Sequence, residues 1–233
     1  MVYKRYFAEQ LSEHLFVVGQ EPALGGLEVS DCHVYLIVGP SSALAVDAGG
    51  GGAWPFVRAV AERYGWADKI ISHVLVTHGH GDHARGLTAF EAQGALTVCS
   101  AYTADHLDSL EDADVIFERD GALELGEFTV QAVLTPGHTP GCTSYRLEVD
   151  GKLCLFTGDL IQADGGLGWS GSEGFSQEQV LQSLKKLAAM PAPDWLLTGH
   201  SVVVGGMEVL RKGISYGEKG QWLPWTDKAP RMP

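Results

Sequence analysis

The segment 77–83 reads THGHGDH and places three imidazoles and a carboxylate within six residues: His78, His80, Asp82 and His83. The glycines between them add almost no side-chain bulk, so the four groups can converge on a small ion. Imidazole and carboxylate both bind zinc, with zinc–nitrogen bonds of about 2.0–2.1 Å. The segment therefore predicts a metal site rather than a polar turn with surface histidines.

The elements around this segment indicate how it is positioned. The apolar run 74–76 predicts a buried strand, and the glycines after it predict a turn. His78 and His80 are two residues apart on a chain that leaves a strand, so they can point the same way and share one ion. Asp82 and His83 follow at the start of a helical pattern, which we expect over 82–92, and can face a second ion.

Three further apolar runs, 130–134, 153–156 and 195–197, each end in a glycine-containing turn with one candidate ligand. These ligands are His138, Asp159 and His200. His138 lies inside the sequence TPGHTPG, where two prolines and two glycines predict a rigid loop. Loops at strand ends often carry function, and the repetition suggests that four of them meet at one rim.

In this order the residues resemble the pattern of the metallo-β-lactamase superfamily, H-x-H-x-D-H followed by a single His, an Asp and a last His. The resemblance spans roughly residues 15–200 and implies an α/β (α+β) fold, a four-layer αββα sandwich. It implies one metal held by His78, His80 and His138, another held by Asp82, His83 and His200, and a bridge through Asp159. Asp47, in the sequence AVDAG, resembles the family's early Asp, which supports the metal site from behind its ligands.

The resemblance implies a metal-dependent hydrolase with a dinuclear site. Two metals roughly 3.5–4 Å apart can activate a bridging hydroxide and polarise a carbonyl, with Asp82 as the catalytic residue that orients the water or carries a proton. A small ester, thioester or lactone is the expected substrate, ahead of a β-lactam or a phosphodiester. Zinc is the expected metal, with iron or manganese as alternatives for these nitrogen and oxygen ligands.

The nearest branch resembles the hydroxyacylglutathione hydrolases (glyoxalase II). Those enzymes place a basic residue after the bridging Asp to hold the glutathione carboxylate, whereas no Lys or Arg lies between Asp159 and Lys185 here. The glycine-rich loop 162–172 carries Trp169, which we expect either to wall the substrate site or to pack at the surface. The alternative function is a mononuclear iron oxidoreductase resembling the persulfide dioxygenases. It ranks second because every ligand of the second position is present, and an electron-transfer role ranks third.

Composition sets further limits. We expect one domain over residues 1–233. The formal net charge of −13, from 16 basic and 29 acidic residues, argues against nucleic acid as a partner. We expect no signal segment and no membrane span, hence a cytoplasmic protein with a small-molecule substrate. Cys32, Cys99, Cys142 and Cys154 are expected to be reduced core residues, with Cys142 able to approach the site. The two tryptophans in 217–225 suggest a packed tail or a homodimer contact.

Strands are expected at 15–18, 35–38, 43–46, 74–76, 96–99, 128–134, 144–149 and 153–156, with a hairpin turn at Asp150 and Gly151. Helices are expected at 53–64, 82–92, 102–107, 176–189 and 207–216. The fourth of these helices has a capping box formed by Ser176 and Gln179. The glycine run 49–52 lacks the residues of a phosphate-binding Walker loop and is expected to be a flexible turn. His14, His33, His73 and His106 are expected to be packed or surface histidines.

Overall fold

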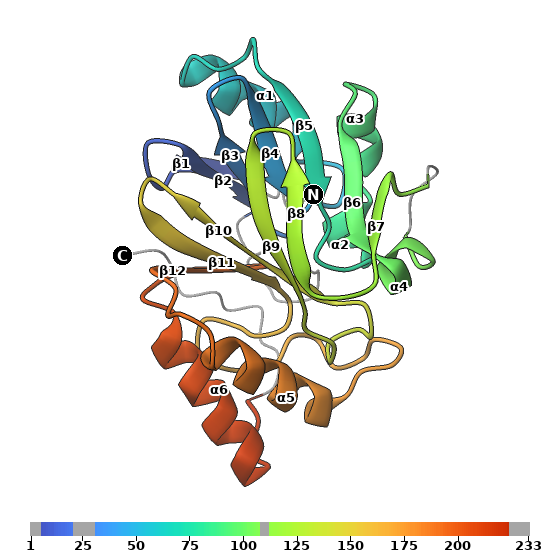
Figure 1. Ribbon diagram of the computed structural model, residues 1–233, viewed down its shortest axis with the longest axis vertical. Helices are drawn as coiled ribbons and strands as arrows, with labels where there is room; N and C mark the ends of the chain where they lie inside the picture. The colour runs from blue at the N-terminus through green and yellow to red at the C-terminus, as the bar shows by residue number, and fades with distance from the viewer. Residues whose placement is uncertain (1–5, 21–30, 108–111, 224–233) are drawn as a thin grey trace, which may run out of the picture.

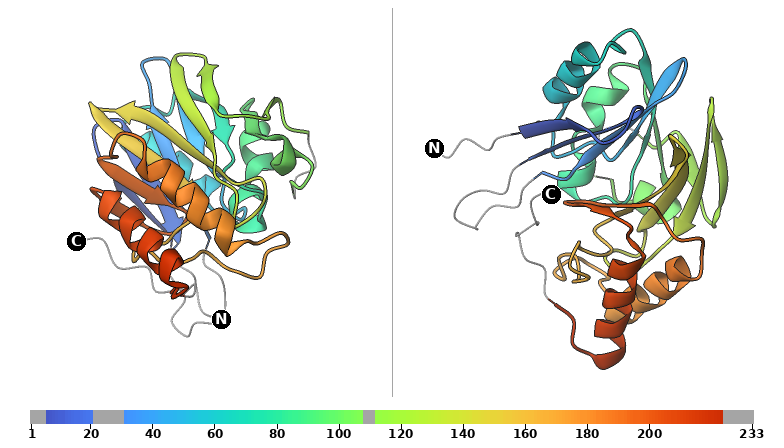
Figure 2. Two further views of the ribbon diagram at one scale, coloured as in Figure 1. Left: turned by 60° about the horizontal axis from the view of Figure 1, so that its bottom comes forward. Right: turned by 90° about the vertical axis from the view of Figure 1, so that its left-hand side faces the viewer.

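Two mixed β-sheets lie face to face between two layers of helices, as Figures 1 and 2 show. The computed structural model describes residues 6–20, 31–107 and 112–223. The first sheet has the order β1 (Tyr6–Gln10), β2 (Leu15–Gln20), β3 (Val34–Val38), β4 (Ser42–Val46), β5 (Ile70–Leu75), β6 (Leu96–Ser100) and β7 (Val115–Phe117). The second has the order β13 (Val202–Val204), β12 (Trp195–Thr198), β11 (Lys152–Gly158), β10 (Thr143–Val149), β9 (Phe128–Leu134) and β8 (Gly121–Leu125). The αββα sandwich expected from the resemblance is confirmed.

Alternating side chains on the strands build separate cores. In β2, Leu15 and Val17 face the second sheet, whereas Phe16 and Val18 face the outer helices. The outer core of the first sheet is covered by α1 (Trp54–Arg63) and α3 (Leu87–Glu91), next to α2 (Gly81–Ala84) and α4 (Ala101–Ala104). Because successive residues of a strand point to opposite faces, a strand buried on both faces is apolar throughout.

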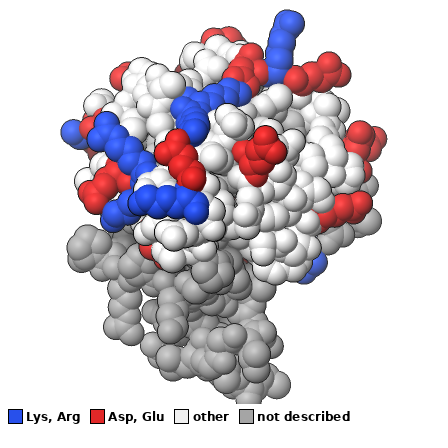
Figure 3. All heavy atoms as spheres, turned by 90° about the horizontal axis from the view of Figure 1, so that it is seen from below, with Lys and Arg blue, Asp and Glu red and all other residues white. Residues whose placement is uncertain are grey.

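The second sheet has its own outer helical layer, formed by α5 (Gln177–Ala188) and α6 (Met207–Lys219). Val180, Leu184 and Leu187 of α5 pack with Leu155 and Leu196 of the sheet. The helix begins as predicted, because the Ser176 side chain accepts a hydrogen bond from the Gln179 N–H. In Figure 3, which views the molecule from below, acidic side chains stand among the basic ones on the exposed face.

Candidate ligands follow the strands that meet at one edge of the sandwich. In the first sheet β4 runs parallel to β5, and in the second β11 runs parallel to β12. Asp47 follows β4, the 77–83 segment follows β5, Asp159 follows β11 and His200 follows β12. The carboxyl ends of parallel neighbours lie at the same edge of a sheet, so these loops are brought together by the topology.

The expected hairpin is present, with Asp150 and Gly151 both at positive φ between β10 and β11. The expected helix over 82–92 is wrong, because the helix is interrupted after Ala84 and resumes at Leu87. Gly86 breaks it by donating its N–H to the Gly49 carbonyl instead of the helix. The expected helix over 102–107 is also shorter and earlier, at Ala101–Ala104.

Five strands, β1, β7, β8, β12 and β13, lie outside the list of expected strands, although the apolar run 195–197 marked the position of β12. The strand β5 begins at Ile70 rather than near residue 74. Trp222 of the expected packed tail lies against the core under α5 and α6, and Trp225 falls outside the described residues. Among the residues described, no helix combines the length and the apolar character that crossing a bilayer requires.

Candidate metal centre

Three imidazole nitrogens form a small triangle in the first candidate ligand group. His78 Nε2 lies 3.0 Å from His80 Nδ1 and 3.2 Å from His138 Nε2, and the last two atoms are 3.0 Å apart. Three nitrogens on one tetrahedral zinc, each at about 2.0–2.1 Å, would be roughly 3.3 Å from one another. The triangle is therefore close to the spacing that a shared ion requires.

The second group lies beside the first and contains two carboxylates and two imidazoles. His83 Nε2 is 3.3 Å from Asp159 Oδ1 and 3.7 Å from Asp82 Oδ2, and His200 Nε2 is 3.5 Å and 3.4 Å from the same two oxygens. The other oxygen of Asp159, Oδ2, is 3.9 Å from His138 Nε2. Asp159 thus faces both groups, which is the arrangement that a bridging carboxylate needs.

The chemistry of these donors fits divalent cations. His83 Nε2 and His200 Nε2 are buried and have no hydrogen-bond partner among the described residues. Burial lowers the pKa of His138 to about 4 and that of His78 well below its ordinary value, so both are neutral and carry a lone pair for an ion. A buried nitrogen without a hydrogen-bond partner is unfavourable in a protein interior, and a bound cation would satisfy His83 Nε2 and His200 Nε2.

The electrostatics of the second group also favour a bound cation. Burial acts to lower the pKa of His200, but Asp159 and Asp82 outweigh it and raise the pKa to about 9. Burial acts to raise the pKa of Asp159, but His200 and His83 hold it well below its ordinary value. The two carboxylates therefore favour positive charge between them, whether as protons on imidazole or as a metal ion.

Asp47 lies behind the candidate ligands, which is the position that the family resemblance implies. Its carboxylate accepts hydrogen bonds from the Thr77 N–H and the Thr77 hydroxyl, each at 2.8 Å, and lies 2.8 Å from His83 Nδ1. This contact leaves His83 Nε2 to face the second group. A carboxylate behind a ligating histidine fixes the tautomer and orientation of its ring.

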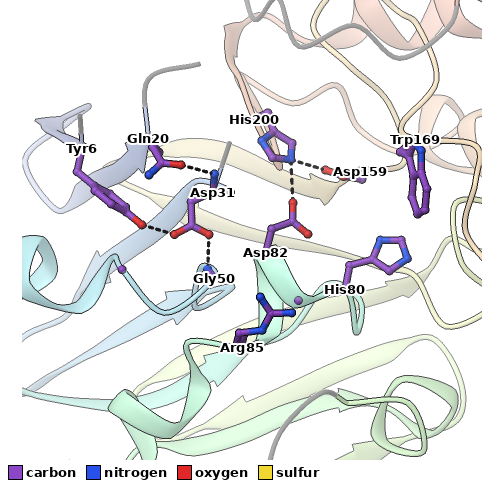
Figure 4. A pocket seen from close by; sticks show the side chains of 12 residues that line it. Tyr6, Gln20, Asp31, Gly50, His80, Asp82, Arg85, Asp159, Trp169 and His200 are labelled. Atoms are coloured by element: carbon purple, nitrogen blue, oxygen red, sulfur yellow. Dashed lines mark hydrogen bonds and ion pairs between the residues drawn. The ribbon is translucent and has the colours of Figure 1, made fainter. Parts of the chain in front are cut away.

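A cavity of about 560 Å³ opens directly onto the candidate ligands, as the close view in Figure 4 shows. His80, Asp82, Asp159 and His200 line it. Trp169, which is 50% exposed, lines it too, with its ring centroid 5.9 Å from that of His80. The position suits the predicted wall of a substrate site, and contact with substrate stays a prediction.

Sequence reasoning missed the opposite side of this cavity. Tyr6, Gln20, Asp31 and Arg85 line it, together with glycines of the run 49–52. No local pattern marks these residues, since they come from β1, β2 and separate loops and meet only in the folded chain. The 49–52 run bends between β4 and α1, and its Gly50 and Gly52 form part of the cavity wall.

The remaining cysteines and histidines mostly lie as expected. All four cysteines are free and buried. Cys32, rather than Cys142, is the thiol grouped with Asp47 and His83, while Cys142 packs inside the loop around His138 with its sulfur 3.2 Å from the Thr139 nitrogen. His33 is packed, and its backbone N–H donates to the Gly199 carbonyl beside His200.

The model of the metallo-beta-lactamase superfamily matches residues 27–200 of the sequence. The chain belongs to the metallo-β-lactamase superfamily. Among curated relatives, the hydroxyacylglutathione hydrolase of Methylococcus capsulatus is 32% identical over 172 residues, which cover 74% of this chain and 63% of that protein. The hydroxyacylglutathione hydrolase of Cereibacter sphaeroides is 33% identical over 150 residues, covering 64% of this chain and 54% of that protein. The chain thus spans less than two thirds of the length of these relatives.

Solved structures agree on the superfamily fold. A metallo-beta-lactamase from Pontibacter korlensis superposes with a TM-score of 0.75 at 19% identity, covering 92% of this chain and 99% of that one. ETHE1 from Myxococcus xanthus superposes with a TM-score of 0.63 at 21% identity, covering 98% and 95%. At these identities the likeness establishes the fold, while the curated relatives place the chain near the hydroxyacylglutathione hydrolase branch of the superfamily.

Proposed function

We propose that this chain is a metal-dependent hydrolase that holds two divalent ions, with zinc as the expected metal, and cleaves a small ester, thioester or lactone. The observation that carries the proposal is the pair of adjacent ligand groups at the floor of one cavity. His78, His80 and His138 would hold one ion, and Asp82, His83 and His200 the other, with Asp159 between them. Two such ions supply an activated water and polarise the substrate carbonyl.

The residues of the chain divide the remaining work. Asp82 is the most accessible carboxylate of the second group, with 24% of its side chain exposed against 9% for Asp159. It can therefore accept a proton at the cavity surface, which is the role of a general base. Asp47 is buried and lies 2.8 Å from His83 Nδ1, so it would hold this member of the second group in place from behind.

The cavity wall supports a substrate of modest size. Trp169 offers an apolar surface beside His80, on the side from which an acyl chain could approach. The names of the curated relatives favour a thioester within the proposed class. Among the described residues that line the cavity, Arg85 is the cationic one. The loop after Asp159 has no Lys or Arg, so an anionic group of the substrate would contact Arg85 instead.

The proposal is tested by the metal content and turnover of protein purified without chelators from cultures supplied with zinc, iron or manganese. We expect about two ions per chain, with turnover of thioester, ester or lactone probes. His80→Ala should remain folded and lose both metal and turnover. His73→Ala is the matched control, because this half-buried histidine in β5 contacts Ser72 and belongs to neither ligand group.

Two results would overturn the proposal. Full activity of metal-replete His80→Ala would remove the first group from the chemistry. A content of one iron per chain, with oxygen uptake on a persulfide and no hydrolysis, would favour the oxidoreductase alternative.

A further inference from the structure

Asp31 forms a polar corner on the side of the cavity opposite Trp169 (Figure 4). The Tyr6 hydroxyl donates a hydrogen bond to Oδ2, and the Gly50 N–H donates one to Oδ1. The backbone N–H of Asp31 donates to Gln20 Oε1 at 2.9 Å. The carboxylate is thus oriented by two donors from separate segments, and the backbone of the same residue is fixed by Gln20.

This carboxylate has no cationic partner within the part of the chain that the structure describes. Asp31 is 8% exposed, and its hydrogen bonds with other described side chains are those with Tyr6 and Gln20, both of which are neutral. Each carboxylate oxygen has two lone pairs, and among the described residues one donor reaches each oxygen of Asp31. Burying a negative charge against neutral donors alone is costly, so a cation that reached this corner would be bound favourably.

Tyr6 remains a hydrogen-bond donor in this corner. Burial raises the pKa of its hydroxyl far above the ordinary value, and the hydrogen bond to Asp31 raises it further. The Tyr6 ring is fixed by stacking on Phe56, with the ring centroids 4.6 Å apart. The Tyr6 hydroxyl therefore keeps its proton for the hydrogen bond to Asp31.

The glycine run explains how the corner fits together. A Cβ on Gly50 would lie 2.5 Å from Asp31 Oδ1, and a Cβ on Gly52 would lie 2.1 Å from the Tyr6 hydroxyl oxygen. Neither glycine has a positive φ, so contact with the corner, rather than backbone conformation, requires the missing side chain. The run 49–52 is thus shaped around Asp31 and Tyr6.

We propose that Asp31 binds an ammonium group of the substrate, so that the enzyme selects esters, thioesters or lactones that carry a primary amine away from the scissile carbonyl. The proposal rests on the hydrolase function proposed above, because Asp31 shares its cavity with His80, Asp82 and Asp159. The chain's net charge of −13 also favours the approach of a cationic substrate.

The test compares two short thioesters of equal length, one ending in an ammonium group and the other in a methyl group. We expect the metal-loaded enzyme to prefer the ammonium probe by about tenfold or more in kcat/KM, as a charge-assisted hydrogen bond allows. Asp31→Asn should bring that ratio close to one. Its amide can still accept from Gly50 and donate to Tyr6, so the variant keeps the corner. Asp164→Asn, in the loop after Asp159 and outside the cavity wall, should retain the preference.

A binding measurement tests the role of Asp31 separately from the hydrolase proposal. Ketone analogues of the same two probes, with CH₂ in place of sulfur, cannot be hydrolysed, and their dissociation constants can be measured by calorimetry. If the enzyme turns over neither these thioesters nor the ester and lactone probes, the hydrolase proposal fails while calorimetry still tests Asp31. Equal dissociation constants for the two analogues in the unmodified enzyme would overturn the role of Asp31, and so would a preference that survives Asp31→Asn.

Discussion

At the scale of single residues, Asp47 shows how the chain tolerates an unusual backbone to place one carboxylate. Its φ is 57°, in the left-handed region that Asp and Asn adopt more readily than most residues. From there it accepts from the Thr77 N–H and hydroxyl and contacts His83 Nδ1. One side chain therefore ties the end of β4 to the segment that carries the first four candidate ligands.

We predict that Asp47→Asn lowers metal content from two ions towards one and reduces turnover roughly 10–100-fold, as changes behind a metal ligand typically do. Asn suits the same φ but presents an NH₂ group to one of the donors that Asp47 now accepts. His83 would lose the partner that orients its ring. Metal analysis by mass spectrometry and steady-state kinetics measure the two effects.

Asp150→Asn is the matched control for this prediction. Asp150 has a φ of 53°, and it lies in the β10–β11 turn, where it contacts Ser12 and His14 rather than a candidate ligand. It should change neither metal content nor turnover. If the two variants behaved alike, Asp47 would have no special part in holding the metal.

Local residue patterns account for the part of the site that the sequence predicts. Three imidazoles and a carboxylate within six residues have few other uses, and lone ligands at strand ends repeat the same signal. Asp31 and Tyr6 give no such signal, because they are 25 residues apart and meet only when the glycine run closes over them. Contacts between distant residues without a chemical motif are invisible until the fold is known.

At the scale of elements, turns and caps were predictable where one residue type dictates the geometry. Asp150 and Gly151 adopt positive φ in the hairpin, and Ser176 caps α5. The break between α2 and α3 was not predictable, since it depends on a neighbour. A Cβ on Gly86 would lie 2.1 Å from the Ala48 carbonyl oxygen, and that loop joins β4 to α1.

We predict that Gly86→Ala lowers the free energy of unfolding by about 1–3 kcal/mol, because the added methyl group meets backbone that must move. The loop that moves follows Asp47 directly, so metal content should fall as well. Gly121→Ala is the control, because a Cβ there meets nothing within 4 Å and its φ is not positive. Urea denaturation measures both variants, and equal midpoints would show that the Gly86 contact does not restrain the loop.

At the scale of the whole molecule, two buried tyrosines cross between the sheets in opposite directions. Tyr35 of β3 donates its hydroxyl proton to the Thr198 carbonyl at 2.6 Å, beside His200. Tyr145 of β10 donates to the Val76 carbonyl at 2.9 Å, two residues before His78. The sequence indicated the strands, while the sandwich came from the family resemblance, because no periodicity says which sheet faces which. The hydroxyls of Tyr35 and Tyr145 therefore join the two sheets close to the candidate ligands.

We predict that Tyr35→Phe and Tyr145→Phe each lower the free energy of unfolding by about 1–3 kcal/mol, since each leaves a buried carbonyl without its donor. Tyr35→Phe should also weaken metal binding, because the Thr198 carbonyl is two residues from His200. Tyr64→Phe is the control, since the Tyr64 hydroxyl has no hydrogen-bond partner among the described residues, and its change should stay within about 0.5 kcal/mol. Denaturation with and without added zinc separates the two effects. If Tyr35→Phe loses stability equally in both conditions, the hydroxyl joins the sheets without positioning His200; a larger loss with zinc present would show that it does both.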